Sequence, residues 1–509
     1  MLFLRHTISA ARVLSISALS ITTALISGCA GGGAQQPSTG FSGNTPVTVL
    51  ASSTANDQLS QFNINFTSLT LSTQTGQTAT LLTTPTNVEF IHLNGASEPL
   101  ATASVPQGVY TSATAIIGNS GFVCVANVPS ANSVYVSTYA YGSTPSSQVT
   151  VTLPAPITVT GTAMVLSLDM LVSKSATYSS CAETSPSDTY SINPTFNLAP
   201  ITLASQPTNI QNGRLTGLGG LIASVDTAGS SFTVASADGD LCVPPTGQVC
   251  QPGTSNGPVW QVASNSNTVF QGVGGFSALA AGMPVDMDAT IQPDGSLLAT
   301  RIAVAATNIT NLSVFSGPLI QLASSQPTAS FLGREQQGYL FGIGPGVGSG
   351  YFSFGSATFQ ISSQFTNLEN LPFSATFSAA TMFAGQNISY TTNAPAIQSG
   401  PTYDPAATVT LIPQTIDGTV TTVSSEGGFD TYTVALAPYD LVQNLAVQPG
   451  QTTALTNPGS IVVYADSNTQ MLATDPPTVG GLLRFNGLLF NDHGTAKMDC
   501  AWIGDGVPE

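Results

Sequence analysis

Apolar and polar residues alternate over short stretches of this chain, and a period of two residues is typical of β-strands. The clearest case is one stretch whose apolar face consists of Phe62, Ile64, Phe66, Leu69 and Leu71. The alternation shifts by one residue between Phe66 and Leu69. A turn signal follows at residues 73–76, and apolar residues resume over 78–82. This pattern predicts a β-hairpin.

Two further strands are predicted in the same region. Residues 88–93 are predicted to form a strand that ends at Asn94-Gly95, a pair typical of tight turns, and residues 105–108 turn the chain into another strand. Across the chain there are 49 Gly and 33 Pro, and β-branched residues are abundant, whereas capped and charged helical stripes are missing. The pattern therefore predicts an all-β protein.

From residue 207 onward the pattern repeats. Three units open at Gly220, Gly317 and Gly418, and their later turn glycines are Gly282, Gly385 and Gly480. In the first unit we expect strands over 220–226, 231–234 and 268–270, a fourth after the turn at 279–285, and a last one containing Arg301. Because a period of roughly 100 residues is far above that of solenoid repeats, each unit is predicted to fold as a domain.

The chain is accordingly divided into six parts. We expect a signal peptide at residues 1–28, a flexible tether at 29–46 and an N-terminal domain at 47–206. Three modules follow at 207–310, 311–412 and 413–509. The second module is divergent, because a Gly-rich insertion lies at residues 342–350.

The N-terminus has the pattern of a secretory signal: Arg5, His6 and Arg12 precede or border an apolar run over 13–26. The sequence Ile-Ser-Gly-Cys at 26–29 resembles the lipobox of bacterial lipoproteins. That resemblance implies a lipid on Cys29, with cleavage leaving Cys29 as the first residue, and stable membrane anchoring. Since Ala30 rather than Asp follows, it also implies an outer-membrane location.

The amino-acid composition excludes one class of partner. Charged residues make up 6% of the chain, the net charge is −17, and no cluster of basic residues occurs. Nucleic-acid binding needs such a cluster, so we expect none. No second apolar run is long enough to span a bilayer.

Two stretches resemble known families. The order TGxxxxL, VxFxxLNG and VPxGxYT in the N-terminal domain is similar to domain-of-unknown-function family 4382, which comprises lipoproteins with a β-sandwich-like module. The first module, with its GxIxxVD, SFTV, LxxGxxV and DGxLxA segments, resembles domain-of-unknown-function family 5666. That resemblance implies small OB-like β-barrels. Together they predict a β-sandwich-like domain followed by three tandem barrels.

Six cysteines are present. With Cys29 lipidated and the chain exported, disulfides are plausible between the remaining ones. The expected pairs are Cys242 with Cys250, across a turn-rich loop, and Cys124 with Cys181. Cys500 is then expected to be buried and free. The zinc-ligand spacing of close Cys and His pairs is absent.

No motif predicts catalysis. The sequence Gly-Thr-Ser-Asn-Gly at 253–257 satisfies G-x-S-x-G, but flanking prolines favour a loop over a strained strand-to-helix turn. The mature histidines, His92 and His493, lie far apart and outside any catalytic motif. We therefore expect no enzyme activity and no cofactor.

Two groups of residues are candidate ligand sites, each with a structural alternative that the pattern favours. Carboxylates that would take a cation are Asp286, Asp288 and Asp294, although turn and edge-strand roles suit them better. Aromatic residues that would contact a ligand around the Gly-rich insertion are Tyr339, Phe341 and Tyr351, although buried barrel rings are the simpler interpretation.

The sequence thus favours a non-enzymatic, lipid-anchored envelope protein with a structural, adhesion or ligand-capture role. Its expected partners are the membrane, through the N-terminal lipid, and an envelope protein or glycan. The alternative is a carbohydrate-binding or carbohydrate-active envelope protein.

Overall fold

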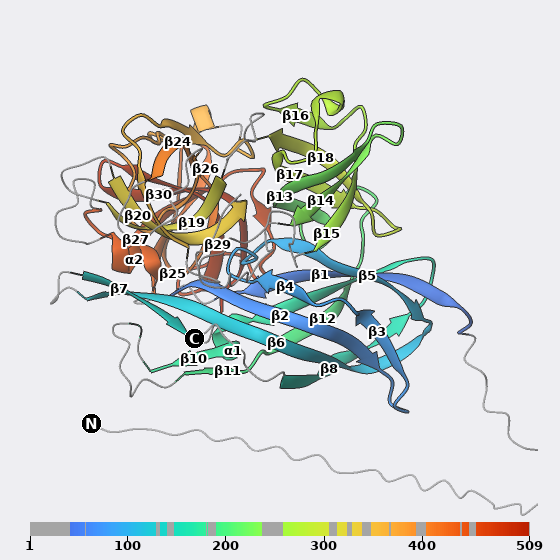
Figure 1. Ribbon diagram of the computed structural model, residues 1–509. Coiled ribbons are helices and arrows are strands. Elements are labelled where there is room, and N and C mark those ends of the chain that lie inside the picture. Colours follow the sequence, from blue (N-terminus) through green and yellow to red (C-terminus); the bar gives the residue numbers. More distant parts are fainter. Residues whose placement is uncertain are drawn as a thin grey trace, which may run out of the picture. The chain divides into compact units, whose positions relative to one another are not determined.

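Strands make up nearly all of the regular structure in the computed structural model of this chain (Figure 1). The structure describes residues 41–55, 58–128, 133–139, 147–179, 181, 190–236, 258–304, 313–322, 328–337, 348–365, 368–392, 404–437, 440–446 and 455–507. The predicted all-β class is confirmed.

The N-terminal domain is a sandwich of two sheets. The first sheet has the order β12-β9-β1-β5, and the second has β3-β2-β6-β7, with β4 also on β2 and β8 also on β6. The strands of the first sheet are β1 (Asn44–Thr54), β5 (Ser97–Pro106), β9 (Met164–Leu171) and β12 (Phe196–Ile201). Those of the second are β2 (Leu59–Ser72), β3 (Thr78–Leu82), β4 (Thr86–Glu89), β6 (Gly108–Val128), β7 (Ser133–Tyr139) and β8 (Ser147–Val159). A short helix and a two-stranded ribbon complete it, α1 (Val172–Ser175), β10 (Ala176–Tyr178) and β11 (Tyr190–Ile192).

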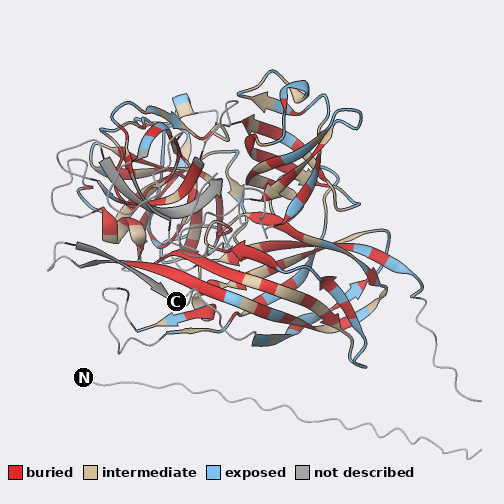
Figure 2. Cartoon of the chain, in the orientation of Figure 1, coloured by how far each residue is buried: buried red, intermediate tan, exposed pale blue. Residues whose placement is uncertain are grey.

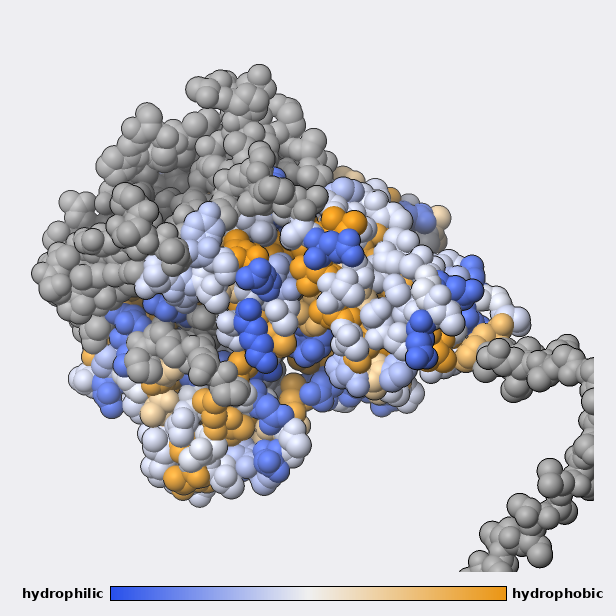
Figure 3. Space-filling model, turned by 90° about the horizontal axis from the view of Figure 1, so that it is seen from below, coloured by the Kyte–Doolittle hydropathy of each residue, from blue (hydrophilic) through white to orange (hydrophobic). Residues whose placement is uncertain are grey.

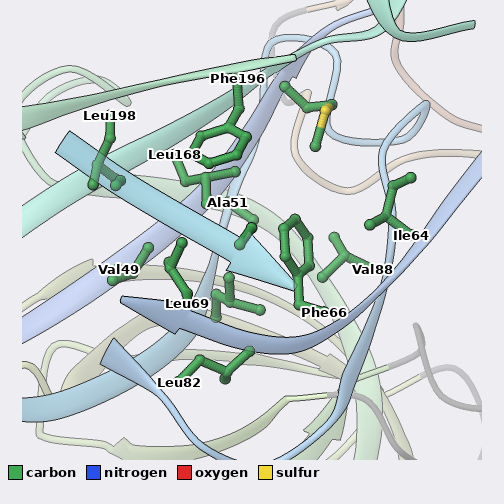
Figure 4. Close-up of a cluster of buried hydrophobic side chains, with 14 of the residues drawn as sticks. Val49, Ala51, Ile64, Phe66, Leu69, Leu82, Val88, Leu168, Phe196 and Leu198 are labelled. Carbon is green, nitrogen blue, oxygen red and sulfur yellow. The ribbon is translucent and has the colours of Figure 1, made fainter. Parts of the chain in front are cut away.

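The predicted alternation of β2 explains how the sandwich core forms. Its five apolar residues from Phe62 to Leu71 are all fully buried, and the pairing with β6 shifts register around Phe66, where the sequence changes phase. Figure 4 shows Leu69 beside Val49 of β1 and Phe66 beside Val88 of β4, and Phe196 of β12 belongs to the same core cluster. Each such side chain contributes roughly 1.5–3 kcal/mol on burial, so the hairpin pattern largely specifies this core. The predicted partner strand is β3, which pairs with β2 as expected.

The two faces of β1 serve two cores. Consecutive side chains of a strand point to opposite faces. Val49 therefore packs inside the sandwich, whereas Leu50 packs with Val165 into the core of the first module. The Trp260 Nε1 of that module also donates a hydrogen bond of 2.8 Å to the Pro99 carbonyl oxygen.

Each of the three modules forms a six-stranded sheet with one topology. In every module the order is third-second-first-fifth-sixth-fourth, and a parallel pairing of the third and sixth strands closes a barrel. The closed ring of five strands has the connectivity of an OB-type Greek-key barrel. The first module contains β13 (Arg214–Asp226), β14 (Ser231–Ser236), β15 (Val259–Ala263), β16 (Val269–Gln271), β17 (Pro284–Ile291) and β18 (Leu297–Val304).

The other two modules repeat this arrangement. The second contains β19 (Ser313–Leu322), β20 (Thr328–Gln337), β21 (Gly348–Ser353), β22 (Thr358–Ile361), β23 (Asn387–Thr392) and β24 (Asp404–Leu411). The third contains β25 (Gln414–Glu426), β26 (Phe429–Leu436), β27 (Ser460–Ala465), β28 (Gln470–Met471), β29 (Leu482–Asp492) and β30 (Thr495–Asp505). Short helical segments are η2 (Phe276–Ala278), η3 (Leu368–Asn370) and α2 (Leu441–Leu445).

The repeated turn glycine has the same role in all three modules. Its N–H donates to a carbonyl of the first strand at 2.7–2.8 Å, and the N–H of that same strand residue donates to the carbonyl of the residue after the glycine at 2.9–3.0 Å. The pairs are Ile222 with Gly282, Leu319 with Gly385, and Val420 with Gly480. All three glycines have φ between +88° and +100°, a region that favours glycine. The sequence repeat is therefore a structural repeat, including in the divergent second module.

Two details differ from expectation. The sandwich begins at Asn44, three residues inside the predicted tether. In the first module, the predicted third strand at 268–270 is the fourth, β16, because β15 precedes it. The strand around Trp260 escaped notice because it directly follows the predicted loop.

Burial follows the strands of every domain, and exposed residues gather at turns and strand ends (Figure 2). On the face in Figure 3, hydrophobic patches are separated by hydrophilic ones. None of the helices in the described part of the chain has the length and apolar character that crossing a bilayer requires.

Candidate ligand-binding cavity

The loop of residues 90–96 joins β4 to β5 and is held by its own buried side chains. Phe90 and Leu93 are fully buried, and the Leu93 carbonyl accepts a hydrogen bond of 3.2 Å from the backbone of β1. The predicted turn at Asn94-Gly95 is present, with a φ of +78° at Gly95. These anchors fix the positions of the side chains between them.

Glu89, at the end of β4, is a buried carboxylate with several donors. Its Oε1 accepts hydrogen bonds of 2.9 Å from the N–H groups of Phe62 and Ile91, and its Oε2 accepts one of 3.0 Å from the His92 N–H. An ionised carboxylate is an acceptor only, so this set of N–H donors suits its charged form.

His92 lies between two carboxylates. Its Nδ1 is 3.0 Å from Glu89 Oε2 and its Nε2 is 3.2 Å from Glu98 Oε1, with both glutamates almost fully buried. The three residues form a charged cluster in which each ring nitrogen lies against a carboxylate oxygen, an arrangement that does not suit a general base.

The same loop contacts the third module. The Asn94 carbonyl accepts a hydrogen bond of 2.6 Å from Thr415 Oγ1, and Asn94 Oδ1 accepts one of 3.2 Å from Arg484 Nη1. Gly95 lies directly against the indole of Trp502, which a Cβ at this position would approach to 1.8 Å. Arg484 stacks on the same indole at 5.9 Å. Trp502 is thus covered and anchors the loop.

A second charged cluster lies in the first module. Arg301 of β18 donates from Nε and Nη2 to Asp288 of β17 at 3.0 Å, and Nη2 also contacts Asp286 on the same strand face. Its Nη1 donates to Ser363 of the second module at 3.1 Å. Burial raises the pKa of Asp286, and the Arg301 charge opposes that rise. Arg301 and Asp288 are buried, whereas 46% of the Asp286 side chain remains accessible.

Both clusters border one cavity of about 610 Å³. The residues that line it come from the sandwich and all three modules, and residues 42–509 form a single unit by their contacts. The lining carboxylates are Glu89, Glu98, Asp286 and Asp440. Neither Lys nor Arg is among the described lining residues. The volume is within the range of small-molecule sites.

Polar groups in the wall differ in how they are satisfied. Asp440 caps α2, accepting from the N–H of Val442 at 2.7 Å and of Gln443 at 3.2 Å, so its charge is already engaged. In contrast, Gln271 Oε1 is buried and has no hydrogen-bond partner within the described part of the chain. A buried acceptor without a donor is costly.

A second hollow of about 400 Å³ lies beside Asp466 and Asp499 of the third module. Burial, with a further contribution from the Asp466 charge, raises the pKa of Asp499 to about 6. Asp466 accepts the N–H groups of Asn468 and Thr469 in a tight turn.

The predicted cation ligands do not form a site. Asp286 and Asp288 pair with Arg301, whereas Asp294 accepts hydrogen bonds from Ser296 in an exposed turn. No group of three or more His, Cys, Asp or Glu residues in the described ranges is arranged to hold a metal ion. Grouping these three aspartates was wrong, because the sequence did not reveal that Arg301 would lie against two of them.

Of the three aromatic residues predicted to contact a ligand, only Tyr351 lies within the described residues. Tyr339 and Phe341 lie outside the described residues, and Tyr351 belongs to β21. The neighbouring Phe352 is fully buried and stacks on Tyr390 with a centroid distance of 4.5 Å. Where rings are described, they pack in the barrel core.

One predicted cysteine pair is described. Cys124 of β6 and Cys181 form a disulfide, with a Cα–Cα distance of 5.6 Å. Cys500 is buried and free, as expected, and burial raises its thiol pKa. Cys29, Cys242 and Cys250 lie outside the described residues.

Of the residues considered above for catalysis, only the histidines lie within the described part of the chain. The G-x-S-x-G stretch at 253–257 lies outside the described residues. His493 is 90% exposed and pairs with its neighbour Asp492 at 2.8 Å.

The charged cluster of the loop escaped the sequence analysis, although a signal was present. Glu89, His92 and Glu98 bring three ionisable residues into ten positions of a chain that is only 6% charged. Such density around a predicted strand and turn indicates a polar site in a core.

Comparison with known proteins identifies one segment. A family model described as "Domain of unknown function (DUF5666)" matches residues 219–303, which correspond to most of the first module. No curated protein matches the chain.

Proposed function

We propose that this protein is a non-enzymatic, lipid-anchored envelope protein that captures a small polar ligand in the cavity between its sandwich and barrels. The observation that carries the proposal is the cavity itself. It has the volume of a small-molecule site, and its wall combines buried carboxylates with the unsatisfied acceptor of Gln271.

The anchored part of the proposal is supported by the lipobox-like sequence ending at Cys29. The resemblance of the N-terminal domain to lipoproteins of family 4382 points the same way. An outer-membrane location follows from the residue after the cysteine, Ala30.

Capture without chemistry is supported by His92, the one histidine among the described lining residues. Both of its ring nitrogens face carboxylates, so this imidazole is not free to act as a base. The ligand should therefore be recovered unchanged after binding.

Anchoring is tested by palmitate labelling of the wild type, Cys29→Ala and, as a matched control, Cys500→Ala. We expect label to be lost only in Cys29→Ala, because Cys500 is buried and its thiol is poorly ionised. Equal labelling of Cys29→Ala and the wild type would contradict the anchor.

Capture is tested by thermal unfolding of the chain from residue 30 onward with a panel of sugars, amines, acids and nucleosides. A ligand at about a hundred times its Kd stabilises a protein by about 2.7 kcal/mol, which is readily detected. Ser389→Trp, which places a large ring on a half-buried wall position, should abolish the shift. Thr80→Trp, on an exposed position of β3, should retain it. A shift that survives Ser389→Trp would place binding elsewhere.

A further inference from the structure

We infer that the captured ligand is a small aliphatic amine carrying one or two positive charges, an inference that rests on the proposed capture function. The first argument is the charge of the wall. Four carboxylates line the cavity, and the imidazole of His92 is the only basic group among its described lining residues. An anionic ligand would meet repulsion there, whereas a cation would be attracted.

The second argument is that one carboxylate keeps an open side. Asp288 and its partner Arg301 are buried. Asp286, which lies on the same strand as Asp288, keeps 46% of its side chain accessible. Because Asp286 lines the cavity, this accessible side is available to a ligand. Arg301 pairs with Asp286 through Nη2, but it is shared with Asp288, to which it donates two hydrogen bonds. The accessible side of Asp286 can therefore still take a second cation, from a ligand.

The third argument is the unsatisfied acceptor. Gln271 is among the residues that line the same cavity, and its buried Oε1 receives no hydrogen bond from the described residues. A primary ammonium group has three N–H donors and no acceptor, so it can satisfy a carboxylate and an amide oxygen together.

The fourth argument separates an amine from a sugar. Trp502 is the only Phe, Tyr or Trp among the described lining residues, and Gly95 and Arg484 cover its ring. Sugar rings and quaternary ammonium groups are usually held on open aromatic faces. The apolar wall is instead aliphatic, with residues such as Leu59, Ile91, Ile361 and Ile412, and it suits a methylene chain.

The net charge of −17 agrees with a cationic ligand at longer range. A negative surface raises the local concentration of cations and their association rate, an effect that salt weakens.

The test uses isothermal titration calorimetry on the chain from residue 30 onward, with 1,5-diaminopentane as the probe. The comparison compounds are 1,5-pentanediol, glutarate and maltose. The matched variants are Asp286→Asn, which removes the open carboxylate, and Asp294→Asn, which removes the same charge from an exposed turn of the same module.

We expect the diamine to bind and the diol and diacid to bind at least about tenfold more weakly, since one charged contact is typically worth a factor of that order. Asp286→Asn should weaken diamine binding about tenfold, whereas Asp294→Asn should change it less than about twofold. Circular dichroism of both variants checks that the fold is retained.

Equal effects of the two variants, or binding of maltose or the diol without the diamine, would overturn the amine inference and leave the capture function standing. If neither these compounds nor any member of the wider panel binds, the proposed function fails as well.

Discussion

The imidazole of His92 joins two buried carboxylates, with Nδ1 3.0 Å from Glu89 and Nε2 3.2 Å from Glu98. Both glutamates belong to strands of the sandwich and line the cavity. Their contacts with His92 compensate the two buried carboxylates on this side of the wall. A buried ion pair adds little net stability compared with an apolar pair, but losing one partner leaves an uncompensated charge.

His92→Ala should therefore destabilise the protein by about 3–5 kcal/mol. The measurement is urea unfolding followed by circular dichroism. His493→Ala is the matched control, because this histidine is 90% exposed and an exposed pair contributes at most about 1 kcal/mol. Similar losses of unfolding free energy in the two variants would show that the Glu89–His92–Glu98 contacts stabilise the fold no more than an exposed pair does.

Gly95→Ala should lower the free energy of unfolding by more than the strain of a positive φ alone would. The Cβ would come within 1.8 Å of the Trp502 ring, so the loop of residues 90–96 must shift away from the third module. We expect a red shift of tryptophan fluorescence and a stability loss of at least about 2 kcal/mol.

The control for this variant is Gly76→Ala. Gly76 has a φ of +84°, and nothing lies within 4 Å of its would-be Cβ. Its cost should be only the backbone term of about 1–2 kcal/mol, with no change of fluorescence. Equal behaviour of the two alanine variants would argue against the contact between Gly95 and Trp502.

Asp499 should make the protein less stable as the pH rises. Its folded-state pKa of about 6 lies above the ordinary value of 3.8, so the folded state holds the proton more tightly than the unfolded chain does. Stability should fall as the pH rises from about 4 to about 6, by about 3 kcal/mol for a shift of about two units.

Asp499→Asn should remove this fall and raise stability at pH 7.5. Asp505→Asn is the control, because hydrogen bonds from Thr474 hold the pKa of Asp505 below its usual value, so removing that charge should give no gain. Unfolding free energies at pH 4.5, 6 and 7.5 measure both variants. An unchanged pH dependence in Asp499→Asn would contradict this account.

The disulfide between Cys124 and Cys181 should make the sandwich sensitive to reduction. It closes a loop of 57 residues, and a crosslink of that span contributes typically 2–4 kcal/mol. Urea unfolding of the wild type should shift by that amount on adding dithiothreitol. The double variant Cys124→Ser/Cys181→Ser should start at the lower stability.

The remaining redox dependence of that double variant tests the second predicted pair. A residual shift that disappears when Cys242→Ser and Cys250→Ser are added to that double variant would support the pairing of Cys242 with Cys250. A full wild-type shift in Cys124→Ser/Cys181→Ser would contradict the first disulfide.

Much of the fold follows from local patterns in the sequence. The alternation from Phe62 to Leu71 predicts β2 and its buried face, because a strand places every second side chain on one side. The repeated glycines, such as Gly220 and Gly282, predict three equivalent domains. Each module needs glycine where the chain takes a positive φ or where a Cβ would clash with the next strand.

The site depends on contacts that no local pattern specifies. Asp286 and Arg301 are 15 residues apart, and only the pairing of β17 with β18 brings their side chains together. Gly95 and Trp502 are separated by most of the chain and meet because the sandwich loop packs on the last strand of the third module. The sequence by itself thus determined the strands, the repeat and the candidate anchor at Cys29. Tertiary structure alone decided which buried charges share a cavity, because packing between domains has no period in the sequence.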